Sequence, residues 1–151
     1  MIKIKIHDWN YIWNIEELWE KLNTYHMGIS KYFKDKYANL TFSKRVQSLL
    51  RKTDVKNVFI ISATSEENQQ LVGYLIFTID KIQKQGNIDS LFVLEHYRNY
   101  GIGKALMDAA IHHLEEHGID SIFLDVLPEN NLAITFYESL GFHSEILKMK
   151  K

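Results

Sequence analysis

The sequence predicts an α+β fold, an α/β sandwich in which a mixed, mainly antiparallel twisted sheet carries helices on both faces. The first supporting observation is that apolar residues along the 151-residue chain switch between strand-like alternation and helical spacing. The second is the resulting order of elements, β-α-α-β-β-β-α-β-α-β, which no repeat, low-complexity stretch or linker interrupts. A chain of this length is expected to form one domain over residues 1–151.

The N-terminal third is predicted to contain one strand and two helices. Apolar and basic residues alternate over Ile2–Ile6, which is typical of a strand with one apolar face. Asn14 and Glu17 fit a capping box at the start of a helix whose apolar spacing continues to residue 29. A second amphipathic helix is expected over residues 42–50, where Phe, Val and Leu recur at helical spacing.

The central part of the chain is predicted to form three strands. The stretches 57–63 and 71–79 are rich in β-branched and aromatic residues, and the polar stretch 65–70 between them resembles a turn. These two stretches therefore predict an antiparallel hairpin. After a short turn, residues 88–94 have the composition of a further strand.

The last third predicts two helices, each ended by a glycine, and two strands. A strand over residues 121–126 separates the helices, and Asn130 or Asn131 is suited to cap the second helix. A final strand is expected over about residues 142–149.

The composition excludes several classes of protein. With 46% hydrophobic and 25% charged residues, the chain is neither disordered nor fibrous. Its 18 basic and 19 acidic residues give a net charge of −1, so we expect neither a nucleic-acid nor a membrane partner. The absence of cysteine excludes disulfides, thiolate metal sites and a cysteine nucleophile. The alternating N-terminus does not resemble a signal peptide, and we expect a cytoplasmic protein.

A loop with two glycines is the most informative segment. It reads Arg98-Asn99-Tyr100-Gly101-Ile102-Gly103 and joins a predicted strand to a predicted helix. The free N–H groups and partial positive charge of a helix N-terminus form an anion site, most often for phosphate. A Walker motif requires Gly at position 98 and Ser or Thr at position 105, where this chain has Arg98 and Ala105. A dinucleotide-binding fingerprint requires Gly or Ala at position 106, where this chain has Leu106. By itself, the loop fits a plain strand–turn–helix connection equally well.

Two motifs together resemble those of the Gcn5-related N-acetyltransferase (GNAT) superfamily. The first reads Arg98-x-x-Gly101-x-Gly103, and the second reads Asn130-x-x-Ala133-x-x-x-Tyr137-x-x-x-Gly141-Phe142. The strand before the first motif has the Leu-x-Val ending that the superfamily shows. Two motifs in the right order and spacing are far more specific than one, and the predicted order of elements agrees with the acyl-CoA N-acyltransferase (GNAT) fold.

The resemblance implies acetyl-CoA as co-substrate and no metal. The amides of the glycine loop would bind the cofactor's pyrophosphate, and the strand before the loop would pair with the pantetheine arm where two central strands splay apart. Asn130 would contact that arm. The implied cofactor-binding residues are Leu91, Phe92, Val93, Arg98, Asn99, Tyr100, Gly101, Ile102, Gly103, Lys104 and Asn130.

Acyl transfer from a thioester to an amine sets the chemical requirements of such a site. The amine must lose a proton, because a lysine-like amine with a pKa of about 10.4 is almost entirely protonated at neutral pH. A donor must stabilise the tetrahedral oxyanion, and the leaving thiolate needs a proton or a hydrogen bond. No covalent enzyme intermediate is required, so direct attack in a ternary complex suits a chain without cysteine.

The resemblance supplies candidates for these tasks. Tyr137 is the candidate general acid near the sulfur, since a phenol stays protonated at neutral pH. The backbone N–H of Phe92 or Val93 would stabilise the oxyanion. Asp125 and Asp89 are alternative candidates for the base, acting directly or through water. Spacing alone also fits Tyr137 as a core aromatic and both aspartates as solvated or ion-paired groups.

The acceptor is expected to be a primary amine of a small molecule or peptide, and the near-neutral charge favours neither. A homodimer is compatible with the resemblance. The alternative hypothesis is a non-catalytic acyl-CoA-binding sensor or interaction module.

The remaining aromatic and histidine residues are expected to have simpler roles. His113 and His117 lie four residues apart on a predicted helix but lack a third metal ligand, so we expect them to be structural. The resemblance implies that the first two helices wall the acceptor site. The candidates for lining it are Tyr25, His26, Tyr32 and Phe33.

Overall fold

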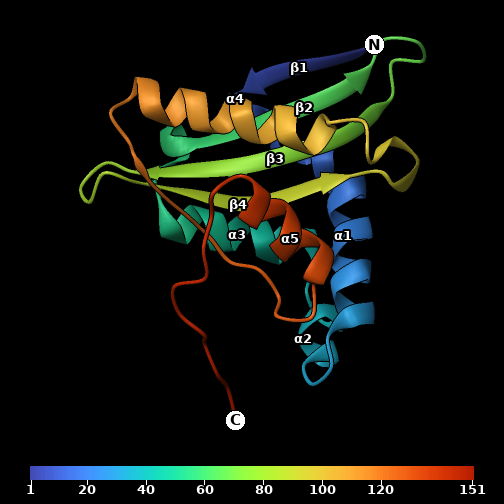
Figure 1. Ribbon diagram of the computed structural model, residues 1–151, viewed down its shortest axis with the longest axis vertical. Coiled ribbons are helices and arrows are strands. Elements are labelled where there is room, and N and C mark those ends of the chain that lie inside the picture. Colours follow the sequence, from blue (N-terminus) through green and yellow to red (C-terminus); the bar gives the residue numbers. More distant parts are fainter.

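The computed structural model describes residues 1–151 and contains one five-stranded sheet in the spatial order β1-β2-β3-β4-β5 (Figure 1). The strands are β1 (Ile2–His7), β2 (Val58–Ser65), β3 (Leu71–Asp80), β4 (Gln85–Val93) and β5 (Ser121–Leu124). The first four strands are antiparallel to their neighbours, and β5 runs parallel to β4. The predicted mixed, mainly antiparallel sheet is therefore confirmed.

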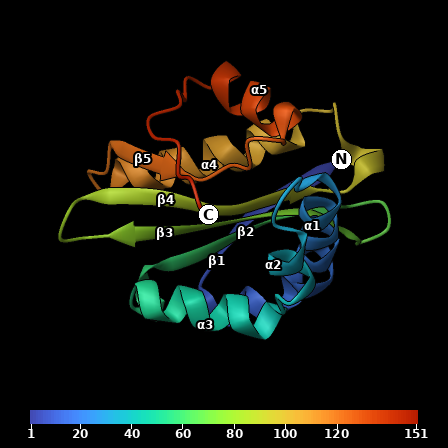
Figure 2. The ribbon, with the colours of Figure 1, turned by 90° about the horizontal axis from the view of Figure 1, so that it is seen from below.

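Helices cover both faces of this sheet (Figure 2). One face carries α1 (Glu16–Ile29), α2 (Lys34–Ala38) and α3 (Phe42–Lys52), and the other carries α4 (Ile102–Glu116) and α5 (Asn131–Ser139). Three short 3₁₀ helices, η1 (Trp9–Ile15), η2 (Val55–Asn57) and η3 (Glu95–Tyr97), complete the chain. No helix combines the length and apolar character needed to span a bilayer.

The sheet separates two hydrophobic cores, and strand β3 contributes to both. Leu75 and Phe77 belong to the core beneath α4, whereas Tyr74 and Ile76 belong to the core beneath α1 and α3. Alternate residues of a strand face opposite sides of a sheet. A strand buried on both faces reads as a nearly continuous apolar run, which accounts for the composition of β3.

Strand β4 contains a β-bulge and then separates from β5. Ser90 lies opposite Ile76 and Ile88 lies opposite Phe77, so Asp89 is the extra residue. Pairing between β4 and β5 covers only Gln85–Ile88, while β4 continues to Val93. The edge of β4 beyond the bulge therefore has no neighbouring strand, and the predicted splay of the central strands is confirmed.

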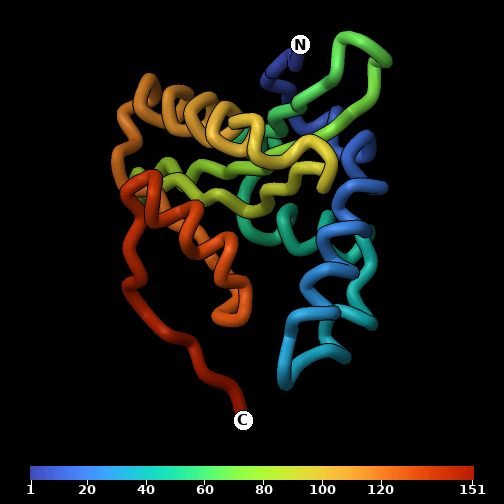
Figure 3. The backbone as a smooth tube through the Cα atoms, turned by 45° about the vertical axis from the view of Figure 1, so that its right-hand side comes forward, coloured from blue at the N-terminus to red at the C-terminus, as the bar shows by residue number.

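The prediction of a final strand is wrong. Residues 142–151 form no strand and leave α5 as an extended tail (Figure 3). Ile146, Leu147 and Met149 are all strongly exposed. Because Ile146 and Leu147 are adjacent, an extended chain would turn them to opposite sides, and no single apolar face forms.

The predicted cap at Asn14 is also wrong. Helix η1 runs directly into α1, and its own N-cap is Asp8, whose side chain accepts a hydrogen bond from the Asn10 N–H at 2.9 Å. The N–H of Glu16 is already bonded to the Trp13 carbonyl. The first amide of α1 therefore needs no side-chain cap, and none is present.

Candidate functional site

The glycine loop presents a series of unpaired backbone amides at the start of α4. Asn99 and Gly101 adopt left-handed conformations, with φ of 68° and 80°. The first bond of the helix runs from the Ala105 N–H to the Gly101 carbonyl at 3.0 Å, and none of the N–H groups of residues 99–104 donates to another part of the chain. Such a cluster of donors at a helix N-terminus suits an anion with several oxygens.

The two basic side chains of the loop are held away from these amides. Arg98 folds back onto the end of β4, where its Nε donates to the Val93 carbonyl at 2.8 Å and its guanidinium carbon lies 5.2 Å from the centre of the Phe92 ring. Lys104 pairs with Asp108 at 2.6 Å on the exposed side of α4. The anion-binding capacity of the loop therefore comes mainly from its backbone.

Hydrogen bonding fixes which groups of β4 face the open edge. The Leu94 N–H donates to the Val72 carbonyl of β3 at 2.8 Å. In an antiparallel pair, alternate residues direct both backbone groups toward the neighbouring strand. Phe92 therefore faces β3, whereas Leu91 and Val93 face the opening. Of the two amides considered for the oxyanion, this alternation favours that of Val93.

Tyr137 combines core packing with an unpaired hydroxyl. Its ring lies 5.3 Å from the Phe136 ring and 6.1 Å from the Phe142 ring, and its hydroxyl makes no hydrogen bond within the chain. Burial raises the pKa of Tyr137 to about 12. The hydroxyl is thus fully protonated at neutral pH.

A second tyrosine lies beside the bulge of β4. The Tyr74 hydroxyl bonds to the Ser90 Oγ at 2.7 Å. Burial raises the pKa of Tyr74 above its usual value, Arg45 lowers it, and the negative charge of an ionised Tyr137 would raise it further. Arg45, which comes from α3, bonds to the carbonyl of Asp89, the residue before Ser90.

Asn130 has a structural task at the start of α5. It is 8% exposed, and its Oδ1 accepts a hydrogen bond from the Ala133 N–H at 3.2 Å. This confirms Asn130, rather than Asn131, as the helix cap. This hydrogen bond uses the side-chain oxygen of Asn130, and the Nδ2 of Asn130 has no partner in the chain.

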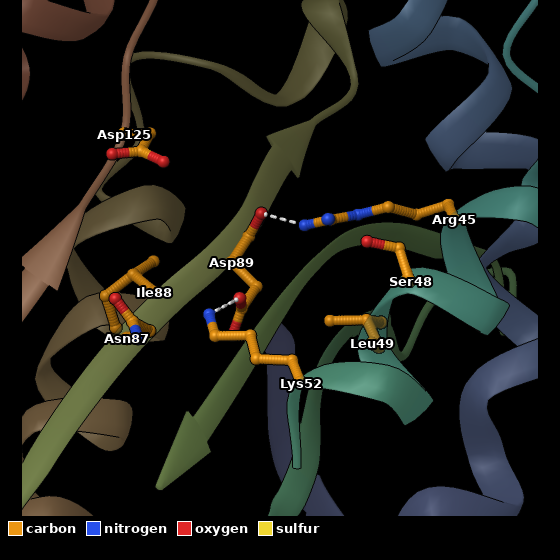
Figure 4. A pocket seen from close by; sticks show the side chains of 8 residues that line it. All are labelled: Arg45, Ser48, Leu49, Lys52, Asn87, Ile88, Asp89 and Asp125. Atoms are coloured by element: carbon orange, nitrogen blue, oxygen red, sulfur yellow. Dashed lines mark hydrogen bonds and ion pairs between the residues drawn. The ribbon is translucent and has the colours of Figure 1, made fainter. Parts of the chain in front are cut away.

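The two candidate bases line one cavity of about 250 Å³ between α3 and β4 (Figure 4). The carboxylate of Asp89 is 5% exposed and fully engaged, because one oxygen pairs with Lys52 at 2.5 Å and the other accepts from Thr78 at 2.7 Å. Asp125 follows β5, is exposed and has no ion-pair partner. The complete lining is Arg45, Ser48, Leu49, Lys52, Asn87, Ile88, Asp89 and Asp125.

Sequence reasoning missed the basic wall of this cavity. Arg45 and Lys52 are seven residues apart on α3 and therefore lie on the same helical face as the buried Leu49. Basic residues continuing an apolar face are a signal that could have identified them. The four residues expected to wall an acceptor site, Tyr25, His26, Tyr32 and Phe33, do not line this cavity.

Comparison with known proteins relates this arrangement to a family. An N-alpha-acetyltransferase of Sulfurisphaera tokodaii is 33% identical over 89 residues, which cover 52% of this chain and 53% of that protein. A ribosomal-protein-alanine N-acetyltransferase of Escherichia coli is 28% identical over 82 residues, 54% of each chain. Both matches therefore span about half the length of the relative.

A solved structure and a family profile extend the comparison to most of the chain. The N-acetyltransferase PaiA of Thermoplasma acidophilum, in complex with coenzyme A, superposes with a TM-score of 0.74 at 19% identity. The match covers 98% of this chain and 93% of that one. The profile of the acetyltransferase (GNAT) family matches residues 8–142. The chain therefore belongs to the acetyltransferase (GNAT) family.

Proposed function

We propose that this protein is an acetyl-CoA-dependent N-acetyltransferase that transfers the acetyl group directly to a primary amine in a ternary complex. The observation that carries this proposal is the row of unpaired amides at residues 99–104 next to the open edge of β4. The coenzyme A bound to the Thermoplasma neighbour supports the same class of cofactor. Because the two relatives are an N-alpha-acetyltransferase and a ribosomal-protein-alanine N-acetyltransferase, the N-terminal amine of a peptide is the first acceptor to test.

The chain offers separate groups for each part of the cofactor. The amides of residues 99–104 would bind the pyrophosphate, since they combine donors with the positive end of α4. The free backbone groups of Leu91 would pair with the amides of the pantetheine arm, as a neighbouring strand would, whereas the Val93 carbonyl already accepts from Arg98. Asn130 would donate through its Nδ2, because its oxygen is already used in the cap of α5.

Two protonated groups would support the chemical step. The Val93 N–H would hydrogen-bond the developing oxyanion, a contribution that can amount to about 3 kcal/mol of transition-state stabilisation. The Tyr137 hydroxyl would donate to the departing sulfur. Its pKa of about 12 keeps the hydroxyl protonated, so that it can donate a hydrogen bond to the sulfur as the thiolate forms. The protein supplies no covalent intermediate in this scheme.

The hydrogen bonds of the two aspartates support Asp125 as the base. Both oxygens of Asp89 have partners in the chain, so accepting a further proton would disrupt an ion pair. The Asp125 carboxylate has no such partner and is open to water. We therefore assign Asp125 to the removal of the amine proton, directly or through a water molecule, and Asp89 to the architecture of the bulge.

Release of free thiol from acetyl-CoA in the presence of peptide and small-molecule amines tests this proposal. Tyr137→Phe is the decisive variant, because it removes only the hydroxyl from a packed ring. We expect kcat to fall about 100-fold or more while cofactor affinity is retained. Unchanged turnover in this variant would refute the role of Tyr137. Cofactor binding by the native protein without thiol release across the panel would support a non-catalytic acyl-CoA-binding module instead.

A further inference from the structure

Arg45 has capacity for a ligand that nothing in the chain uses. It is half-buried on α3, and its single hydrogen bond within the chain runs to the backbone carbonyl of Asp89 at 2.7 Å. The ion pairs of the protein join Lys52 to Asp89, Lys104 to Asp108 and His112 to Glu116, so no carboxylate pairs with Arg45. A guanidinium carries several donors in a rigid plane. Most of these donors have no acceptor within the protein.

The bond to Asp89 fixes the position of this cation. Asp89 is the extra residue of the bulge, and the carbonyl that Arg45 contacts belongs to the backbone of β4. Figure 4 shows Arg45 reaching from α3 toward this carbonyl, with Asp125 on the opposite side of Asp89. The cavity therefore has an unpaired cation on one wall and an unpaired carboxylate on another. Its other charged pair, Lys52 with Asp89, is internally neutralised.

Backbone geometry also connects Arg45 to the proposed reaction centre. Arg45 bonds to the carbonyl of Asp89, and the next residue, Ser90, bonds to the Tyr74 hydroxyl. These residues belong to the strand whose open edge beyond the bulge is proposed to hold the acyl group. A ligand group held by Arg45 would consequently lie beside the same strand as the acyl group to be transferred.

We infer that Arg45 binds a carboxylate of the acceptor, so that the preferred acceptor carries an anionic group as well as the reactive amine. This inference rests on the proposed N-acetyltransferase function and adds the class of its substrate. Arginine binds carboxylates through two parallel hydrogen bonds, which positions the ligand as well as attracting it. Asp125 on the other wall attracts the protonated amine before it loses its proton. Free amino acids and peptides with an acidic residue both have this chemistry.

Matched acceptors separate these two sources. One pair consists of a free amino acid and its carboxamide, and the other of two peptides that differ only in glutamate or glutamine at the second residue. The quantity compared is kcat/KM for the acidic member of each pair divided by that for its neutral counterpart. A hydrogen-bonded charge pair predicts a ratio on the order of 10 to 100 in the pair that matches the natural source.

Arg45→Gln is expected to reduce this ratio to near one, and Arg45→Lys to restore it in part. Arg51→Gln is the matched control, because Arg51 is an exposed cation of the same helix outside the cavity. It removes the same charge and should leave the ratio unchanged. Circular dichroism of each variant verifies that the fold persists.

Two results would overturn the inference. The first is a ratio near one for both pairs in the native protein. The second is an equal loss for acidic and neutral acceptors in Arg45→Gln, which would mean that Arg45 only supports the bulge. If no acceptor is acetylated, the proposed N-acetyltransferase function fails instead. Calorimetric titration of the same acceptors into the protein with coenzyme A present then tests whether Arg45 binds a carboxylate. Binding that requires both the carboxylate and Arg45 supports it, and absence of such binding refutes it.

Discussion

The loop at the start of α4 offers backbone groups, whereas the cavity beside α3 offers side chains. The loop is one short stretch, and its amides become available because Asn99 and Gly101 adopt left-handed conformations. The cavity collects Arg45, Asp89 and Asp125 from three distant segments. Backbone recognition tolerates changes of most side chains but not of local conformation. Side-chain recognition depends on individual residues and suits a substrate that differs between family members.

The largest expected effect separates the two aspartates of the cavity. Asp125→Asn should lower kcat about 100-fold, because a carboxamide cannot accept the amine proton. Asp89→Asn should instead lower the midpoint of thermal unfolding, because it breaks the bond pattern with Lys52 and Thr78. Steady-state kinetics and melting curves of both variants test this division. The reverse pattern would assign the base to Asp89.

The second prediction concerns the conformation of the loop. Gly101→Val forces a β-branched residue into a φ of 80°, at a strain of about 1–3 kcal/mol. We expect cofactor affinity to fall about 10-fold or more, measured by calorimetric titration with coenzyme A.

A valine Cβ at position 101 would have no neighbour within 4 Å, so the expected loss arises from the backbone alone. Gly28→Ala is the matched control, since its added Cβ also meets nothing but lies on α1 far along the chain. Native affinity in a folded Gly101→Val protein would show that the loop does not hold the cofactor.

The third prediction compares one substitution on the two sides of the sheet. Lys52→Met leaves the Asp89 carboxylate, which is 5% exposed, without its cation, and should lower the free energy of unfolding by about 1–3 kcal/mol. Lys104→Met breaks an exposed pair with Asp108 and should cost less than about 1 kcal/mol. Urea unfolding of both variants measures the difference. Equal losses of unfolding free energy in the two variants would mean that the burial of Asp89 does not strengthen its ion pair with Lys52.

The smallest expected effect is a pH dependence of stability from His113. Burial lowers the pKa of His113 below 6.5, and its Nε2 has no hydrogen-bond partner. The unfolded chain therefore takes up a proton near pH 6.5 that the folded chain takes up only at lower pH. Stability is thus complete above pH 6.5 and declines as the pH falls below it.

Substitution of His113 should make this decline shallower. Its ring packs 4.7 Å from Phe59 and 5.4 Å from Phe77, so His113→Phe keeps an aromatic ring there without a titratable group. Burial also lowers the pKa of His7 and His26, which should retain part of the slope. Melting temperatures from pH 7 to about pH 5 provide the measurement. An unaltered slope in His113→Phe would contradict the prediction.

Features that are continuous in sequence could be predicted. The glycine loop was identified because its residues are contiguous, and the buried run of β3 because burial on both faces leaves a simple apolar signal. Helix α2 was missed because it spans only Lys34–Ala38 and buries a single residue, Tyr37. A final strand was expected from residue preference alone, although the tail offers no continuous apolar face.

The cavity could not be assembled from sequence, because its charges depend on tertiary pairing. Nothing local indicates that Lys52 neutralises Asp89 while Arg45 finds only a backbone carbonyl. The two aspartates therefore appeared equivalent as candidate bases, and their hydrogen bonds distinguish them in the fold.

The extra residue at Asp89 also acts as a phase shift within β4. Before Asp89, the even-numbered positions Gly86 and Ile88 face α4. After Asp89, the odd-numbered positions Leu91 and Val93 face α4. If Asp89 were instead paired in the ladder as an ordinary strand residue, the even-numbered positions would keep facing α4 along the whole of β4. Phe92 would then enter the core beneath α4, and its amide rather than that of Val93 would face the opening. A single inserted residue thus determines both which side chains complete each core and which amide is available to the thioester.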